Sequence, residues 1–243
     1  MTIRDSPLNF ETLRESVLMF NLIFPPLCHA CERILTQGEK GICTNCRHEL
    51  PQTNYHLQNP NPIELHFFGR IAIARATSFL KFEPNNRVQH LLHELKYHVQ
   101  QSIGTMIGRW FGSILKESRF FGHVDMVIPV PISAKRIRER SYNQVAYFAV
   151  ALADEFGCEC SMDILQKSKE VKSQVTLTAE VRTKVLSDTF SAKSNNPLKA
   201  KSNLLLVDDL ITTGATLEAC TNTLHSAGYH NVNLATIAAT ISS

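Results

Sequence analysis

The chain has 243 residues, of which 44% are hydrophobic, and a formal net charge of +3 at pH 7. This length provides one medium-sized domain with its own core and a small appendage, and it excludes two large domains. The charge by itself does not indicate duplex DNA as a partner, because domains that bind duplex DNA concentrate far more Lys and Arg on one face.

The apolar stretch at residues 17–25 predicts neither a membrane span nor a secretory signal peptide. It is shorter than the roughly 18 apolar residues that a spanning helix needs. Acidic residues precede it, where a signal peptide has cations, and Pro25 and Pro26 occur without a small-residue cleavage pattern. We therefore expect a soluble cytoplasmic protein with no membrane span.

Four of the seven cysteines stand as two C-x₂-C pairs, Cys28 with Cys31 and Cys43 with Cys46. Each pair can place two thiolates on one metal ion, and the intervening residues leave room for a hairpin. Two such pairs complete the closed, tetrahedral site that structural Zn²⁺ prefers. A redox-active pair is the alternative, although one C-x₂-C motif suffices for that chemistry. Because this segment is too short for a core of its own, we expect zinc to hold it folded.

Composition divides the chain into three parts. Residues 1–55 contain the two cysteine pairs and show little periodicity. Residues 56–66 belong to a stretch rich in Pro and Asn, which is typical of a linker. Residues 67–243 alternate between strand-like and helix-like segments, and we expect them to form the main domain.

Within the main domain, the hydrophobic pattern predicts elements in the following chain order: a strand at 71–82, helices at 87–97 and 103–115, a strand at 124–130, a long helix at 134–156, a strand at 203–207, a helix at 215–227 and a strand at 232–239. Residues 167–196 lack apolar continuity and predict a loop that is mobile in part. Nearly continuous apolar strands separated by helices indicate an α/β fold with a parallel sheet covered on both faces.

Two carboxylates, Asp208 and Asp209, follow the buried strand at 203–207. In an open parallel sheet, the carboxyl edge of the strands is where ligands bind. Carboxylates at this edge can accept hydrogen bonds from two vicinal ribose hydroxyls, and they favour a nearby Mg²⁺. The alternative is an acidic pair in an ordinary turn.

The turn after the acidic pair reads Thr212-Thr213-Gly214-Ala215-Thr216 and begins a helix. Backbone N–H groups at the helix start, the helix dipole and the threonine hydroxyls would hold a phosphate dianion. Gly214 would let the backbone approach that phosphate closely. An ordinary N-cap is the alternative, but the complete run in this order favours a phosphorylated ribose.

The run at 204–216 resembles the signature of type I phosphoribosyltransferases, and the chain resembles more narrowly the competence protein F (ComF) family. The narrower resemblance rests on Pro129-Val130-Pro131 with Arg136, Arg140, Tyr142, Asn143 and Gln144, on Leu95-Lys96-Tyr97, and on Ser173-Gln174, Leu177, Arg182 and Phe190. It implies a type I phosphoribosyltransferase-like domain preceded by a small zinc ribbon. It also implies a pocket for phosphoribosyl pyrophosphate (PRPP) with Mg²⁺, formed by Asp208, Asp209, Thr212, Thr213, Gly214, Ala215, Thr216, Arg136, Arg140 and Lys96.

Arg136 and Arg140 are four residues apart and would share one face of the predicted helix. Near the carboxyl edge of the sheet, that face would meet pyrophosphate or a nucleic-acid backbone. The alternative is a solvated helix start in which Lys135 pairs with Glu139. The resemblance favours the functional interpretation.

Two weaker patterns concern aromatic and histidine side chains. Tyr97 and Tyr142 lie beside cations in the sequence, an arrangement that can stack the bases of a single strand. His90, His93, Glu94 and His98 share one predicted helix but match no metal motif, so we expect a solvated or partly packed helix face.

Two functions of different class fit these patterns. In the first, suggested by the resemblance, the protein is a competence factor that handles internalised single-stranded DNA beside the DNA-uptake machinery during natural transformation. In the second, it is an active phosphoribosyltransferase that transfers ribose 5-phosphate from PRPP to an unidentified acceptor and releases pyrophosphate. The sequence assigns no residue to catalysis.

Overall fold

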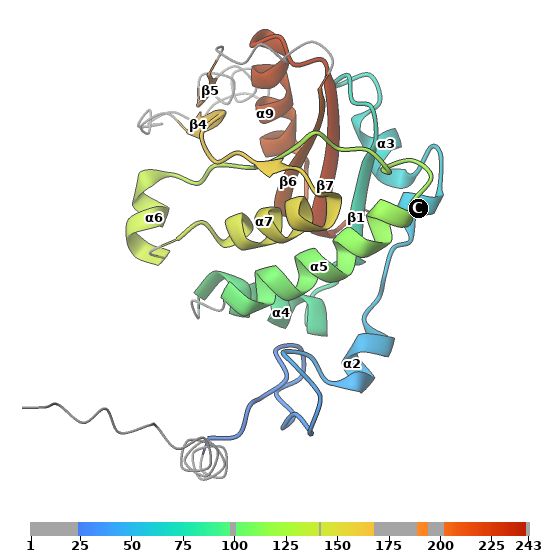
Figure 1. Cartoon of the computed structure of the whole chain (residues 1–243), viewed down its shortest axis with the longest axis vertical. Coiled ribbons are helices and arrows are strands. Elements are labelled where there is room, and N and C mark those ends of the chain that lie inside the picture. Colours follow the sequence, from blue (N-terminus) through green and yellow to red (C-terminus); the bar gives the residue numbers. More distant parts are fainter. Residues whose placement is uncertain (1–23, 98–100, 141, 168–188, 194–201, 242–243) are drawn as a thin grey trace, which may run out of the picture. The chain divides into compact units, whose positions relative to one another are not determined.

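The computed structural model describes residues 24–97, 101–140, 142–167, 189–193 and 202–241 (Figure 1). The predicted mobile loop at 167–196 lies largely outside these ranges, as do Ser173, Gln174, Leu177, Arg182 and His98. The side chains of Tyr97 and Arg140 are outside them as well. The chain divides into two compact units, Met1–Glu49 and Leu50–Ser243.

The first unit is organised around its cysteines. Isolated antiparallel bridges join Leu27 to Ile34 and Lys40 to Ile42, and helix α2 (Thr44–Glu49) follows. Cys28, Cys43 and Cys46 are among its most buried residues, together with Ala30 and Ile42. Within residues 24–49 this apolar core is small, and so small a core does little to offset the chain entropy lost on folding.

A five-stranded parallel sheet forms the centre of the second unit. Its strand order is β1 (Ala76–Lys81), β7 (Asn231–Ala239), β6 (Asn203–Ile211), β2 (Met126–Pro129) and β3 (Glu159–Cys160). All four neighbouring pairs are parallel. The central strands are buried along almost their whole length, as expected for a sheet covered on both faces.

One face of the sheet is covered by α9 (Ala215–Ser226) and α3 (Pro62–Phe67), beside a small antiparallel pair, β4 (Leu165–Lys167) and β5 (Phe190–Ala192). Alternate strand residues such as Leu204 and Leu206 share a core cluster with Leu217 of α9 and Phe67 of α3. This alternation follows from the two-residue period of a strand.

The opposite face is covered by α7 (Gln144–Phe156), α5 (Gln101–Glu117) and α4 (Arg87–Tyr97). From β2, the chain passes through α7 to β3, at the edge of the sheet opposite β1. From β6, the chain passes through α9 to β7, which is a step toward β1 and so in the opposite direction across the sheet. Right-handed crossovers in opposite directions place the two helices on opposite faces. Gly108 of α5 allows the close contact with α7, because a Cβ there would lie 2.6 Å from the Ala151 Cβ.

The predicted long helix at 134–156 is wrong, because it is interrupted before Gln144. The structure has α6 (Ala134–Arg140) and then α7. The Asn143 side chain accepts a hydrogen bond from Val145 N–H at 3.1 Å and donates one to the Val130 carbonyl at 3.1 Å. Asn143 therefore caps a new helix and ties its start to the end of β2.

The stretch at 56–66, where the sequence suggested a linker, contains most of helix α3 and part of η1 (Tyr55–Leu57). Pro62 occupies the first turn of α3, and the Asn61 side chain accepts hydrogen bonds from the N–H groups of Ile63 and Glu64 at 3.0 and 3.1 Å. This arrangement is a strong local signal for a helix start. Among the described residues, no helix has the length and apolar character needed to cross a lipid bilayer.

Candidate functional site

The site lies where the connections of two neighbouring strands diverge. Strands β6 and β2 are adjacent, and their following helices pass to opposite faces of the sheet. Strand β2 ends at Pro129, which is opposite Val207, whereas β6 continues to Ile211. Asp208 and Asp209 therefore lie just beyond the end of β2. This switch point is the position where open parallel sheets bind ligands.

The two carboxylates lie on opposite faces of β6, since successive strand residues alternate. Asp209 is 8% exposed, and its Oδ2 lies 3.1 Å from Lys96 Nζ at the end of α4. The Gln144 Nε2 at the start of α7 donates to the same oxygen at 3.3 Å. Lys96 and Asp209, both predicted site residues, are thus brought into direct contact.

Asp208 is half-buried and accepts a hydrogen bond from the Asp209 N–H at 2.8 Å. Burial, and next the charge of Asp209, raise the pKa of Asp208 to about 8, against the lowering effects of that hydrogen bond and of Lys96 and Lys167. The raised pKa favours the protonated form of this carboxyl group in the free protein. An approaching cation would lower its pKa and release that proton.

The turn at 212–216, which we call the phosphate loop, has the backbone that the sequence predicted. Thr212, Thr213 and Thr216 are exposed, and Gly214 is the N-cap of the 12-residue helix α9. Gly214 has φ of 75°, a left-handed conformation that favours glycine. The loop therefore offers exposed hydroxyls and the positive end of a helix dipole to a phosphate.

Two side chains that the sequence analysis missed contact the phosphate loop from behind. His66 Nε2 lies 3.0 Å from the Thr213 carbonyl oxygen, and Arg70 donates to the same oxygen from both terminal nitrogens at 3.2 Å. No local pattern marks these residues, since Arg70 and Thr213 are 143 positions apart in the chain. Gln144 was noted only as part of a motif, and its contact with Asp209 was not foreseen.

The basic residues after β2 lie on exposed α6. Arg136 is exposed, and so are Lys135 and Arg138 on the same short helix. Within the described ranges, the ion pair of Asp209 is with Lys96 and not with Arg136. Tyr142 donates a hydrogen bond from its hydroxyl to the Leu95 carbonyl at 2.7 Å, which fixes the backbone next to Lys96.

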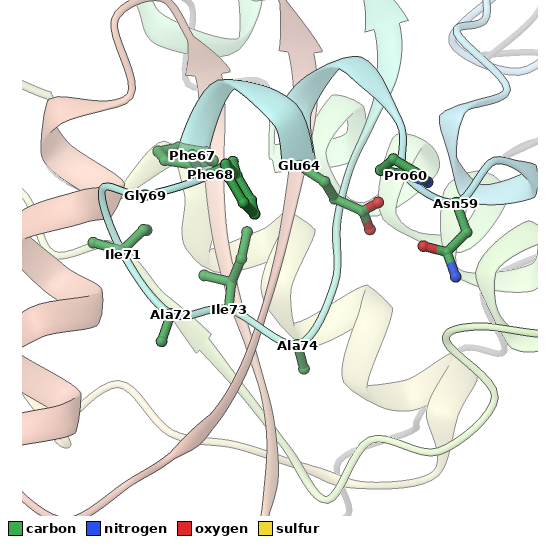
Figure 2. Close-up of a pocket in the computed structure, with 10 residues that line it drawn as sticks. All are labelled: Asn59, Pro60, Glu64, Phe67, Phe68, Gly69, Ile71, Ala72, Ile73 and Ala74. Carbon is green, nitrogen blue, oxygen red and sulfur yellow. The ribbon is translucent and has the colours of Figure 1, made fainter.

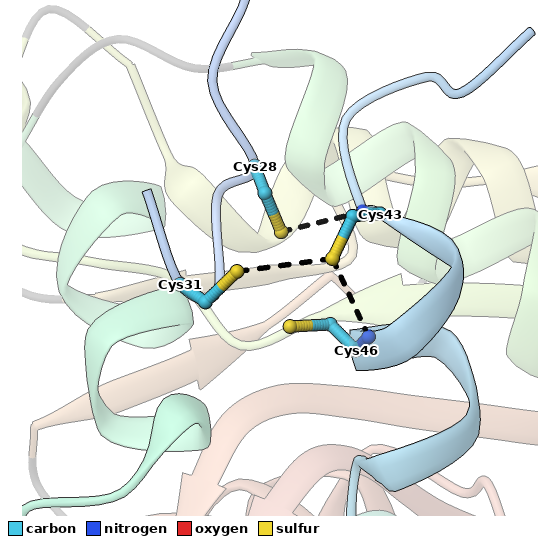
Figure 3. Close-up of side chains that lie close together, drawn as sticks. All are labelled: Cys28, Cys31, Cys43 and Cys46. Atoms are coloured by element: carbon cyan, nitrogen blue, oxygen red, sulfur yellow. Dashed lines mark hydrogen bonds between the residues drawn. The ribbon is translucent and has the colours of Figure 1, made fainter. Parts of the chain in front are cut away.

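The four paired cysteines form the other site, in the first unit (Figure 3). Their Sγ atoms all lie within 4.8 Å of one another, and the Cys31 and Cys43 Sγ atoms are 3.7 Å apart. A tetrahedral Zn²⁺ with Zn–S bonds of about 2.3 Å requires sulfurs separated by about 3.8 Å, so the arrangement fits this ion. The N–H groups of Cys43 and Cys46 donate to Cys28 Sγ and Cys43 Sγ at 3.3 and 3.5 Å.

The neighbouring thiols affect the pKa values of Cys31, Cys43 and Cys46, because they lie within hydrogen-bonding distance of each other. Burial opposes ionisation of Cys31, but hydrogen bonds from the Arg33 backbone and the neighbouring thiols lower its pKa to about 7. Burial raises the pKa of Cys43 and of Cys46. His90 and His93 do not join any comparable metal-binding group within the part of the chain that the structure describes.

Two family models match parts of this chain. Residues 96–243 match the phosphoribosyl transferase domain family, and residues 19–57 match the double zinc ribbon domain. The chain belongs to the phosphoribosyl transferase domain family. The predicted fold class, a parallel-sheet phosphoribosyltransferase-like domain after a small zinc ribbon, is therefore confirmed. The ribbon match and the four-cysteine cluster support the predicted structural zinc.

An individual protein is also similar to this chain. Competence protein F of Haemophilus influenzae is 24% identical over 224 residues, which cover 85% of this chain and 94% of the relative. This similarity confirms the resemblance to the competence protein F family.

Among solved structures, the glutamine PRPP amidotransferase of B. subtilis has a TM-score of 0.42 and 17% identity. The match covers 59% of this chain but spans only 30% of the amidotransferase chain. The adenine phosphoribosyltransferase of Leishmania tarentolae has a TM-score of 0.33 and 13% identity, covering 79% of this chain and 94% of that one.

Proposed function

We propose that the crevice at the ends of β6 and β2 binds PRPP, or a related 5-phosphorylated ribose, together with Mg²⁺. The observation that carries this proposal is the position of the phosphate loop. The phosphate loop leads into the start of helix α9 and follows closely after the Asp208–Asp209 pair, at the switch point of the parallel sheet. A phosphate group needs hydrogen-bond donors, and the hydroxyls of a ribose need acceptors. This edge of the sheet places both side by side.

Each predicted residue has a distinct part in this pocket. The N–H groups and hydroxyls of residues 212–216 bind the 5-phosphate. Asp208 contacts a ribose hydroxyl or the cation, and burial together with the charge of Asp209 raises its pKa in the free protein. Lys96 offsets the charge of Asp209 and stands beside the position of the pyrophosphate. Mg²⁺ bound here would neutralise part of the pyrophosphate charge.

Thermal unfolding with and without ligand tests this proposal. A ligand that binds only the folded state raises the midpoint of unfolding as its concentration exceeds Kd. We expect PRPP with Mg²⁺ to raise the midpoint of the wild type, and to raise that of the double variant Asp208→Ala, Asp209→Ala much less at the same ligand concentration. An equal shift in both proteins would show that the ligand binds elsewhere.

We further propose that the protein handles internalised single-stranded DNA during natural transformation, in contact with the DNA-uptake machinery. The competence protein F relative supports this role, and the exposed Lys135, Arg136 and Arg138 on α6 suit a phosphate backbone. In this role the pocket would respond to a phosphoribosyl ligand or a DNA end. The protein would act in the cytoplasm.

Binding of a single-stranded oligonucleotide as a function of salt tests the DNA role. Arg136→Ala should weaken binding and reduce the slope of log K against log salt by about 0.7 if the side chain contacts one phosphate. Arg119→Ala is the matched control, because Arg119 is also exposed but lies ahead of β2, toward the amino ends of the strands. Absence of binding at low salt would refute the role.

Transfer of ribose 5-phosphate to an acceptor is the second candidate function, and membership of the phosphoribosyl transferase domain family favours it. In such a reaction the bond from ribose C1 to pyrophosphate breaks, and a nucleophile of the acceptor takes its place. Release of pyrophosphate from PRPP in the presence of candidate acceptors measures this directly. Release that requires both an acceptor and Asp208 would establish the enzyme.

A further inference from the structure

The phosphate loop is supported by a cluster from a distant part of the second unit. The Thr213 carbonyl oxygen is contacted by His66 Nε2 at 3.0 Å and by Arg70 Nη1 and Nη2 at 3.2 Å. Arg70 Nη1 also lies 2.7 Å from His66 Nε2, and Arg70 Nη2 lies 2.5 Å from Glu218 Oε2 in the first turn of α9. We call His66, Arg70 and Glu218 the loop brace.

The loop brace fixes the orientation of one peptide group. In a planar trans peptide, the C=O of Thr213 and the N–H of Gly214 point in opposite directions. Because Arg70 holds the carbonyl on the side of the brace, the Gly214 N–H is directed to the other side of the loop. A phosphate bound at the start of α9 requires N–H groups that point outward in this way.

Phe67 adds a steric constraint to the same peptide. A Cβ at Gly214 would lie 2.6 and 2.7 Å from two atoms of the Phe67 ring, so the ring is in contact with the loop backbone. The same Phe67 ring lines a pocket of about 360 Å³ beside α3, which Figure 2 shows together with Phe68 and Ile71. Helix α3 therefore forms a wall against which the phosphate loop packs.

The charges of the brace suit a role in anion binding better than a role in global stability. Arg70 brings a cation to the positive end of the α9 dipole, and Glu218 compensates that charge. The Arg70 side chain is 34% exposed, and exposed ion pairs contribute little to folding. The consequence of the brace should thus appear in ligand affinity.

We propose that Arg70, assisted by His66, is a positioning residue that holds the phosphate loop in its anion-binding conformation. This inference rests on the proposed function of the loop. Residues 66–70 precede the part of the chain that matches the phosphoribosyl transferase domain, residues 96–243, so the earlier segment of the second unit completes the pocket. The expected ligand class is a phosphate monoester such as ribose 5-phosphate.

Two ligands distinguish binding at the phosphate loop from binding in the rest of the pocket. Ribose 5-phosphate engages the phosphate loop, whereas pyrophosphate with Mg²⁺ has no 5-phosphate. We expect Arg70→Gln to weaken ribose 5-phosphate binding about tenfold, as loss of a charge-assisted contact would, with pyrophosphate affinity within about twofold of the wild type. Arg70→Lys should recover part of the loss, because lysine keeps the charge but lacks the forked guanidinium.

Arg119→Gln is the matched control. Arg119 is also an exposed arginine, but it lies ahead of β2, toward the amino ends of the strands and away from the phosphate loop. This variant should bind both probes as the wild type does. Wild-type-like ribose 5-phosphate binding by Arg70→Gln, or equal losses for both probes, would overturn the positioning role. A wild type that binds neither probe would contradict the proposed function instead.

Discussion

Lys96 Nζ lies 3.1 Å from Asp209 Oδ2, which joins the end of α4 to the carboxyl end of β6. The pair links two motifs that are more than a hundred residues apart in the sequence, Leu95-Lys96-Tyr97 and the acidic pair. Tyr142, from a third motif, donates to the carbonyl of Leu95. Residues from two of the stretches that resemble the competence protein F family, Lys96 and Gln144, thus contact the Asp209 carboxylate.

Removing the Lys96 charge should destabilise the protein. Lys96→Met leaves the buried Asp209 carboxylate with Gln144 as its partner, at an expected cost of about 2 kcal/mol in unfolding free energy, measured by urea denaturation. Lys81→Met is the control, because Lys81 forms an exposed pair with Glu83 at 2.9 Å. Its expected cost is much smaller than that of Lys96→Met, because exposed ion pairs contribute little to stability. Equal effects of the two substitutions would refute the importance of the Lys96 pair.

The raised pKa of Asp208 predicts a dependence of stability on pH. The folded protein keeps this proton up to about pH 8, whereas an unfolded carboxyl releases it near pH 4, so stability decreases as the pH rises through this window. Asp208→Asn keeps a neutral side chain at every pH. Its midpoint of thermal unfolding relative to wild type should therefore rise between pH 5 and pH 9.

The exposed Asp163 provides the control for this comparison, since Asp163→Asn removes a carboxylate far less buried than Asp208. Its midpoint relative to wild type should stay constant from pH 5 to pH 9. If Asp208→Asn gave the same flat profile, the carboxyl of Asp208 would already be ionised in the free protein.

Substitution of Gly214 tests the contact between the phosphate loop and α3. Gly214→Ala combines a left-handed backbone with an overlap on the Phe67 ring, and we expect a loss of about 2–3 kcal/mol together with weaker ribose 5-phosphate binding. Gly157 has a similar φ of +71° with open space around it. Gly157→Ala should therefore cost only about 1 kcal/mol and leave ligand affinity unchanged.

Zinc analysis tests the four-cysteine site. Protein purified without chelator should contain one zinc ion per chain, and Cys46→Ser should lower this content and expose residues 24–49 to proteolysis. Cys158→Ser is the control, since Cys158 lies in the second unit, and it should retain the metal. PRPP affinity should be the same in all three proteins. Metal-free wild type would contradict the zinc assignment.

The sequence predicts those parts of the structure that are encoded locally. The phosphate loop and the acidic pair lie within nine consecutive residues, 208–216. The two C-x₂-C pairs are recognised by the spacing of their cysteines alone. The parallel sheet follows from apolar strands separated by helices. These features need no knowledge of distant contacts, because each is a property of a short segment.

The parts that the sequence did not predict depend on contacts between distant residues. Asn143 interrupts the expected helix because its amide reaches the Val130 carbonyl at the end of β2. Arg70 supports the phosphate loop from the turn after α3, and no local pattern marks Arg70 for this contact, because Thr213 is 143 positions away in the chain. The opposite orientation of Asp208 and Asp209 follows from strand alternation once β6 is known to continue to Ile211, beyond the expected end at Val207.

Isothermal titration of PRPP with Mg²⁺ tests the central claim, a phosphoribosyl pocket at the acidic pair, most directly. The wild type and the control Asp163→Ala should bind one ligand per chain with the same affinity. The double variant Asp208→Ala, Asp209→Ala should bind at least about tenfold more weakly, as expected for the loss of two charged contacts. Equal heats and affinities in all three proteins would contradict the pocket.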